Sequence, residues 1–109
     1  MPAFWIARSH ITDPATYKKY TDRVPEIVGR YGGKILARGG RHQIMAGPET
    51  FERYVVIEFA TFEQAVACFE SPEYQEASVF RRAGGVVETV VVQGVQGVQG
   101  VEGGEATPR

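Results

Sequence analysis

The stretch Tyr54-Val55-Val56-Ile57-Glu58-Phe59 decides how this 109-residue chain folds. Its β-branched and aromatic side chains are typical of a buried strand and predict one over residues 53–60. A carboxylate within such a run is costly to bury unless it pairs with a cation or faces a wet cavity. We therefore expect Glu58 to mark a polar pocket.

The segment before this stretch predicts a strand followed by a helix. Residues 3–10 alternate between two faces, as a strand does. Asp13 can cap a helix whose first position is Pro14, where the missing N–H costs nothing. Pro25 should kink or interrupt this helix, and Gly32-Gly33 should end it. Its apolar face repeats at spacings of three and four residues: Tyr17, Tyr20, Val24, Ile27, Val28 and Tyr31.

A hairpin is predicted next. A strand starts at residue 34 and runs to Gly39-Gly40, a pair that indicates a bulge or a close backbone approach. We expect the strand to resume over 41–46, turn through 47–50 and return as the strand over 53–60.

The remaining chain predicts a broken helix and a last strand. Thr61 with Gln64 forms a capping-box pattern, and Ser71-Pro72 restarts the helix in a new direction as far as about residue 82. Valine density over 86–92 predicts a strand buried on both faces.

The order of elements is strand, helix, strand, strand, broken helix, strand. This is the α+β, ferredoxin-like βαββαβ arrangement, with an antiparallel sheet, central first and third strands, and helices on one face. The other face carries valine, isoleucine and phenylalanine, so it is too apolar to be left in water. We expect a second copy to cover it, which predicts a homodimer.

Composition narrows the function further. A net charge of -1 with dispersed Lys and Arg argues against nucleic-acid binding. No apolar run is long enough to span a membrane, and the N-terminus lacks a signal-peptide pattern, so a cytoplasmic location is expected. The single cysteine, Cys68, excludes an internal disulfide and is expected to be a small buried hydrophobe.

The C-terminal segment differs from the rest of the chain. We expect a folded domain over 1–93 and a separate tail over 94–109, built on a repeated Val-Gln-Gly unit. Two interpretations stay open, a flexible extension or an arm that crosses a partner subunit.

Four segments occur in a fixed order: Thr12-Asp13-Pro14 with Tyr17 and Tyr20, Gly32-Gly33 leading to Arg38-Gly39-Gly40, Val55-Val56-Ile57-Glu58-Phe59, and Ser71-Pro72-Glu73-Tyr74-Gln75. Together they resemble the domain-of-unknown-function 1330 family, over about residues 3–95. That family looks like a branch of the dimeric α+β barrel superfamily. The resemblance implies two ferredoxin-like sheets facing each other, a homodimer and a small pocket near the sheet. It implies no settled activity, because superfamily relatives include cofactor-free monooxygenases, isomerases, haem proteins and binding modules.

Glu58 heads the candidate site residues. In a simple hairpin register Arg38 comes within diagonal reach of it, and Arg8 or His10 can approach from the first strand. Glu58 would then act as a base or orient a cation in the pocket. The alternative is a structural Arg–Glu pair inside the barrel.

Two further candidates each have a plain alternative. His10 titrates near physiological pH, which suits a proton shuttle, but it lies at a strand end where exposure is expected. Tyr74 lies near the start of the helix after Ser71, where free N–H groups favour an anion, and core packing explains it equally well. His42 is expected at the surface, while core packing explains Tyr17 and Tyr20.

No cofactor is expected. Haem needs an axial ligand, usually His, and neither predicted helix contains one. The scattered histidines and acids form no metal-ligand spacing. The sequence therefore favours a small homodimeric protein that binds a small metabolite, between sheet and helices or at the dimer interface. The alternative is a cofactor-independent oxygenase or isomerase acting on a small substrate, for example an aromatic one.

Overall fold

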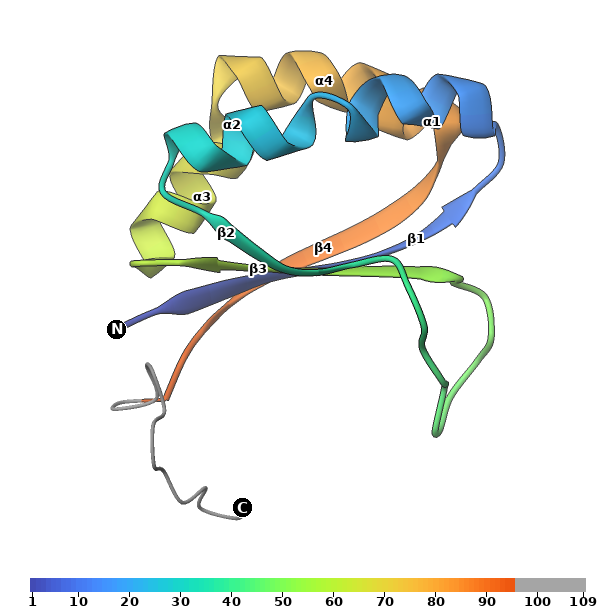
Figure 1. The fold of residues 1–109 in the computed structure, drawn as a ribbon, viewed down its shortest axis with the longest axis horizontal. Coiled ribbons are helices and arrows are strands. Elements are labelled where there is room, and N and C mark those ends of the chain that lie inside the picture. The colour runs from blue at the N-terminus through green and yellow to red at the C-terminus, as the bar shows by residue number, and fades with distance from the viewer. Residues whose placement is uncertain (96–109) are drawn as a thin grey trace.

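The computed structural model describes residues 1–95, which form one four-stranded antiparallel sheet in the order β2-β3-β1-β4. The strands are β1 (Ala3–Ile11), β2 (Lys34–Arg38), β3 (Arg53–Phe59) and β4 (Gly85–Gln93). The helices are α1 (Pro14–Thr21), α2 (Val24–Arg30), α3 (Phe62–Glu70) and α4 (Pro72–Gly84). All of these helices lie on one side of the sheet (Figure 1). The predicted ferredoxin-like α+β fold, with β1 and β3 central, is confirmed.

The helices begin where the sequence provides caps. The Asp13 carboxylate accepts hydrogen bonds from the hydroxyl and from the backbone N–H of Thr16, and these two contacts, the hydroxyl first, lower the pKa of Asp13. The predicted break near Pro25 is confirmed, because α1 ends at Thr21 and α2 restarts at Val24. The break at Ser71-Pro72 is confirmed too, with the Ser71 hydroxyl accepting from the N–H of Tyr74.

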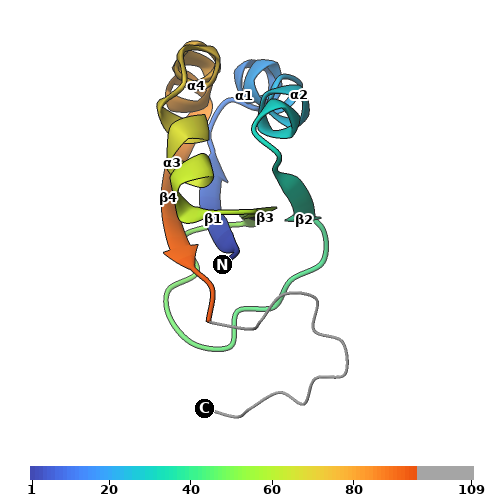
Figure 2. The same ribbon diagram turned by 90° about the vertical axis from the view of Figure 1, so that its left-hand side faces the viewer.

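The hydrophobic core lies between the sheet and the helices. Trp5, Ile57 and Phe59 point from β1 and β3 toward the helices and are almost fully buried. Cys68, from α3, is buried beside them as predicted. Seen end-on, α3 and α4 lie over the β4 side of the sheet, and α1 and α2 over the β2 side (Figure 2).

The predicted strand over 41–46 is wrong. The chain leaves the sheet after Arg38 and returns only at Arg53, so residues 39–52 form a long loop. Gly39 and Gly40 both have positive φ, 65° and 84°, which turns the backbone away from the ladder where a strand would have continued. The antiparallel pairing of β2 with β3 is itself confirmed.

The prediction that residues 86–92 are buried on both faces is wrong for the single protomer. Val86, Val90 and Val92 are 56%, 52% and 45% exposed, because their side chains point away from the helices. Val87 and Val91 point the other way and pack on the core. The sheet thus has a helix face and an open face, and the open face carries exposed valines.

The repeat tract lies almost wholly outside the described residues. β4 ends at Gln93, and both interpretations of the tail stay predictions. Within residues 1–95, no helix is long and apolar enough to cross a bilayer.

Candidate functional site

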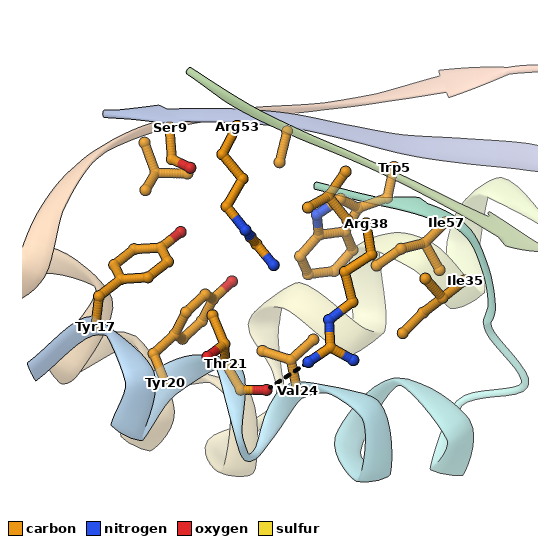
Figure 3. Close-up of a pocket in the computed structure, with 13 residues that line it drawn as sticks. Trp5, Ser9, Tyr17, Tyr20, Thr21, Val24, Ile35, Arg38, Arg53 and Ile57 are labelled. Atoms are coloured by element: carbon orange, nitrogen blue, oxygen red, sulfur yellow. Dashed lines mark hydrogen bonds between the residues drawn. The ribbon is translucent and has the colours of Figure 1, made fainter. Parts of the chain in front are cut away.

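A cleft opens between the helix face of the sheet and helices α1 and α2 (Figure 3). Its walls are mostly apolar, with Trp5, Val24, Ile35, Val55, Ile57 and Val87 in the lining. Polar groups enter the same lining from both layers: Ser9, Arg38 and Arg53 from the sheet, and Tyr17, Tyr20 and Thr21 from α1. An apolar cleft with a few convergent polar groups is the usual form of a small-molecule site.

The cleft exists because α1 does not rest directly on the sheet. α1 packs mainly against α4, through close contact at Gly84. A Cβ atom at Gly84 would lie 2.7 Å from the backbone nitrogen of Tyr17, so only glycine allows this approach. The carbonyl of Gly84 also accepts from the N–H groups of Thr12 and Asp13, which fixes the start of α1. α1 is therefore held from the side, above the sheet.

Two arginines reach into the cleft from neighbouring strands. Arg38 is opposite Val55 in the β2–β3 ladder, and Arg53 is two residues before Val55 on the same face. Such diagonal neighbours are roughly 7–8 Å apart at the backbone. Arg53 extends toward the tyrosine hydroxyls, while Arg38 extends to Thr21, whose carbonyl oxygen accepts from its Nη2 at 3.4 Å (Figure 3).

Neither guanidinium forms an ion pair within residues 1–95, and no carboxylate lines the cleft. The acids that directly adjoin Thr21 and Arg53 in the sequence are engaged elsewhere. Asp22 pairs with Lys18, and Glu52 pairs with His10 on the far side of the sheet. The two positive charges of Arg38 and Arg53 thus face the cleft without a protein anion.

Two buried hydroxyls also face the cleft without a partner. Ser9 is 2% exposed and Tyr17 is 3% exposed, and both residues line the cleft. Neither side-chain oxygen has a hydrogen-bond partner among the described residues, although both remain accessible from the cleft. Buried polar groups are almost always hydrogen-bonded to protein or water, so these two are satisfied by whatever occupies the cleft.

A third hydroxyl in the lining, that of Tyr20, is hydrogen-bonded on its buried side to another tyrosine. It lies 2.7 Å from the hydroxyl of Tyr74, which is itself within 3.4 Å of Arg81 Nη1. Burial raises the pKa of Tyr20 well above its ordinary value, and the neighbouring Tyr74 adds to the effect. Burial raises the pKa of Tyr74 as well. Both tyrosines are therefore neutral hydrogen-bonding groups at physiological pH.

The cleft is small. The space that water can enter is about 30 Å³, enough for about two molecules, and all the space between the lining side chains, open solvent included, is about 470 Å³. The side chains of Arg38 and Arg53 extend from the sheet into the cleft, and Arg38 crosses it to reach Thr21 at the end of α1 (Figure 3). Room for a molecule larger than water would require these side chains to move.

The structure separates the residues that the sequence grouped with Glu58. Glu58 is half-buried on the open face, opposite Phe4 and Lys34, and its carboxylate makes no hydrogen bond or ion pair within residues 1–95. Arg38 was expected within diagonal reach of it, which is wrong. A bulge between Ile35 and Ala37 shifts the register by one residue and turns Arg38 to the helix face.

Arg8 and His10 lie on the open face as well, each with an acid other than Glu58. Arg8 Nη2 binds Glu88 at 2.9 Å across the β1–β4 ladder. His10 Nδ1 lies 2.9 Å from Glu52, whose other oxygen accepts from the N–H of Ile11. The His10 hydrogen bond is the main cause of the lowered pKa of Glu52. Tyr74 is fully buried behind the lining, where its hydroxyl meets that of Tyr20 and its ring packs on Trp5.

A second hollow lies on the open face, beneath the 39–52 loop. Its volume is about 290 Å³, and its lining includes Arg8, His42, Ala46 and Tyr54. The His42 ring packs on Tyr54, with ring centroids 5.0 Å apart. His42 is exposed, as predicted. This hollow is larger but shallower than the cleft, and Arg8 already has a partner.

The sequence reasoning missed Arg53 and Ser9 as members of this site, and it assigned Tyr17 to core packing. A usable signal was present for Arg53, because it shares the strand period with the partly buried Val55 and the buried Ile57 and so had to lie on the helix face. Ser9 shares the period of Trp5 in the same way. Within residues 1–95, no three His, Cys, Asp or Glu side chains gather closely enough to hold a metal ion.

Comparison with known proteins finds a matching family and solved structures of similar fold. A family model described as a domain of unknown function (DUF1330) matches residues 2–95. No curated protein matches the chain in sequence. Among solved structures, a protein of unknown function from Rhodopseudomonas palustris is similar, with a TM-score of 0.72, 18% identity, and 87% of this chain and 83% of that chain covered.

Two other structures are also similar in fold. A dimeric ferredoxin-like protein of unknown function from Jannaschia sp. CCS1 has a TM-score of 0.70 at 10% identity, covering 85% of this chain and 99% of that chain. SnoaB, a cofactor-independent oxygenase from Streptomyces nogalater, has a TM-score of 0.57 at 15% identity, covering 90% of this chain and 97% of that one. At these identities the similarity concerns the fold alone.

Proposed function

Because the chain belongs to the DUF1330 family, whose description assigns no activity, we propose its function from the cleft: the protein binds a small metabolite between α1, α2 and the sheet. In this proposal it acts as a homodimeric binding protein and not as a catalyst. One observation carries it. The cleft gathers two buried residues, Ser9 and Tyr17, whose hydroxyls have no partner among residues 1–95, and two arginines that have no acidic partner there.

Leaving such groups unsatisfied is unfavourable. A buried donor or acceptor without a partner costs about 1–3 kcal/mol, and more if it is charged. Without a ligand, water can satisfy Ser9 and Tyr17, because the space of about 30 Å³ is enough for about two molecules. A ligand with matching acceptors replaces this water and gains the apolar contacts of Trp5 and Ile57.

The lining favours binding over acid–base catalysis. Its hydrogen-bonding side chains come from Ser, Thr, Tyr and Arg. None of these types titrates near neutral pH unless its pKa is strongly lowered, and the pKa of Tyr20 is raised. A general base needs a pKa close to the working pH. These groups are suited to orient a molecule and not to deprotonate it.

The test uses Trp5, because it is the single tryptophan of the chain and lines the cleft. A panel of small metabolites is screened by tryptophan fluorescence and by thermal unfolding. Ligands that fill the cleft should change the emission of Trp5 and raise the melting temperature, as any ligand of the native state does. Ala7→Met fills the cleft, and Ala46→Met, in the lining of the open-face hollow, is the matched control.

We expect Ala7→Met to abolish the response and Ala46→Met to preserve it. Circular dichroism and unfolding curves establish that both variants fold. The opposite pattern would move the site to the open-face hollow. Ligands that bind both variants as they bind the parent protein would refute the proposal.

The homodimer is part of the same proposal. Ile6, Val86, Val90 and Val92 expose apolar surface on the open face, and contiguous surface of this kind usually marks an interface. The similar structure from Jannaschia sp. CCS1 is described as dimeric. A second copy related by two-fold symmetry would cover this face and leave the cleft, on the other side of the sheet, open to solvent.

A second candidate function is a cofactor-independent oxygenase or isomerase. It is favoured by the hollow that contains His42 and Tyr54, and by the description of SnoaB, a protein of similar fold. Oxygen consumption with small aromatic substrates tests it, with His42→Ala and His10→Ala as variants. Turnover that is lost in His42→Ala would favour the enzyme. Binding without turnover, sensitive to Ala7→Met, would favour the binding protein.

A further inference from the structure

We propose that the ligand of the cleft is a small organic carboxylate, whose anionic group is held by Arg38 and Arg53 while its apolar body lies against Trp5. This inference rests on the proposed binding function and specifies its ligand class. The charge of the cleft is the reason. Both guanidiniums enter from the sheet, and the lining contains no acid to balance them (Figure 3).

The backbone geometry brings the two arginines to one anion. They project from the helix face at diagonal positions of the β2–β3 ladder, roughly 7–8 Å apart at the backbone. Long side chains from such positions can converge on a single group. A planar carboxylate matches the guanidinium fork, which donates two parallel hydrogen bonds to it.

In this structure Arg38 is hydrogen-bonded to the backbone at the end of α1. Its Nη2 donates to the carbonyl oxygen of Thr21 at 3.4 Å, a long contact to a neutral acceptor at the end of α1. Hydrogen bonds to an ionised acceptor are roughly twice as strong as neutral ones. A carboxylate therefore displaces the Thr21 carbonyl, Arg38 swings toward Arg53, and the mouth of the cleft opens as the anion binds.

The hydroxyls can donate into the cleft. Arg81 can only donate, so Tyr74 accepts from it, while the hydrogen bond between Tyr74 and Tyr20 can run in either direction. When Tyr74 donates, Tyr20 accepts from it and its own proton is available to the cleft, where Tyr17 can donate as well. A ligand rich in acceptors, such as a carboxylate, suits this set of donors.

A monoanion fits better than a phosphate ester. Thr21 ends α1, so its carbonyl contributes the partial negative charge of a helix C-terminus to the mouth. That charge disfavours a dianion next to it. The enclosed space is also narrow and lined by tryptophan, tyrosine and aliphatic side chains, which suits a flat apolar body better than a hydrated phosphate.

Matched probes separate charge from shape. The affinities of phenylacetate, phenylacetamide and phenyl phosphate are measured by Trp5 fluorescence and calorimetry on the full chain. The variants are Arg53→Gln and Arg38→Gln, with Arg41→Gln, on the exposed loop, as the control. We expect phenylacetate to bind about tenfold or more tightly than the amide. Arg53→Gln should reduce phenylacetate affinity roughly 10- to 100-fold and leave the amide almost unchanged.

Each other outcome has a definite meaning. Equal affinity for acid and amide, both lost in Ala7→Met, would overturn the carboxylate while leaving the binding cleft intact. Tighter binding of phenyl phosphate would overturn it in favour of a phosphorylated ligand. An Arg41→Gln loss equal to that of Arg53→Gln would place the effect in overall charge and refute the arginine clamp. Binding of none of the probes would refute the carboxylate, while the metabolite screen still judges the cleft.

Discussion

The two faces of the sheet treat their charges differently. On the open face, Arg8 pairs with Glu88 and His10 pairs with Glu52. On the helix face, Arg38 and Arg53 have no acidic partner within residues 1–95. The ion pairs of the open face stabilise the protein itself. The two arginines beside the apolar cleft have no protein anion, and in our proposal they bind an anionic ligand.

The apolar side chains show the reverse pattern. On the helix face they are buried in the core, with Trp5 2% exposed and Phe59 fully buried. On the open face Val90, which pairs with Ile6 in the β1–β4 ladder, stays 52% exposed. In our proposal a small ligand fills the cleft on the helix face, and a second copy covers the open face. Substitutions on the helix face should therefore change ligand binding or stability, and substitutions on the open face should change dimer formation.

The largest effect is expected from Val90→Lys. If a second copy covers the open face, two-fold symmetry buries two new lysines without partners, and the dimer should weaken by more than about 100-fold. Val79→Lys is the control, because Val79 on α4 is also 52% exposed. Sedimentation equilibrium measures both. A dimer that tolerates Val90→Lys as well as Val79→Lys would show that the interface lies elsewhere.

Gly84→Ala should have the next largest effect and should act on the cleft wall. The new methyl group would overlap the backbone of Tyr17, which cannot move aside without shifting α1, so we expect a loss of about 1–3 kcal/mol in unfolding free energy. Gly29→Ala in α2 meets no atom within 4 Å and should stabilise by about 0.5–1 kcal/mol. Urea unfolding compares them. Equal stabilities would mean that the Gly84 contact does not position α1.

Tyr74→Phe should cost about 1 kcal/mol, because it removes the hydrogen bond behind Tyr20 in a buried setting. The packing of the ring against Trp5 is kept. Tyr31→Phe is the control, since its hydroxyl makes only a 3.5 Å contact with Glu73. Thermal and urea unfolding measure both variants. A larger loss in Tyr31→Phe would contradict the assignment of Tyr20 and Tyr74 as a buried pair.

The smallest effect concerns pH and belongs to the open face. The pKa of Glu52 is lowered by the hydrogen bond from His10 and then by that of the Ile11 N–H. A lowered pKa gives stability that is present above the ordinary Glu value of about 4.3 and is lost as pH falls through the lowered value. Melting temperatures between neutral and acidic pH should fall less steeply in Glu52→Gln.

Glu49→Gln, on the same loop, serves as the control for this pH series. Its melting curve should follow that of the parent protein at every pH. If Glu52→Gln and the parent protein lost stability in parallel, the His10–Glu52 contact would carry no pH dependence.

Most of the fold followed from sequence patterns, because caps, prolines and strand alternation act locally. Asp13, Pro25 and Ser71-Pro72 marked helix boundaries that the structure confirms. The loop over 39–52 did not follow. Its glycines fitted a bulge within a strand as well as they fitted an exit from the sheet, and only φ values distinguish the two.

The site was harder to predict than the fold, and a single residue explains why. The bulge between Ile35 and Ala37 adds one residue to β2, which moves Arg38 from the face of Glu58 to the cleft. The sequence offered Arg38 as a ligand-binding candidate, and that role stays a proposal, but the neighbours expected for it were wrong. Candidate residues can be recognised from type and spacing, whereas their partners depend on register.

The most direct test is a map of amide NMR shifts during titration with phenylacetate. We predict that the shifts cluster around Ser9, Arg53 and α1. The amides of Val86 and Glu88, two β4 residues whose side chains lie on the open face, should stay unchanged. Shifts centred on the 39–52 loop and the open face, with α1 unmoved, would contradict this prediction.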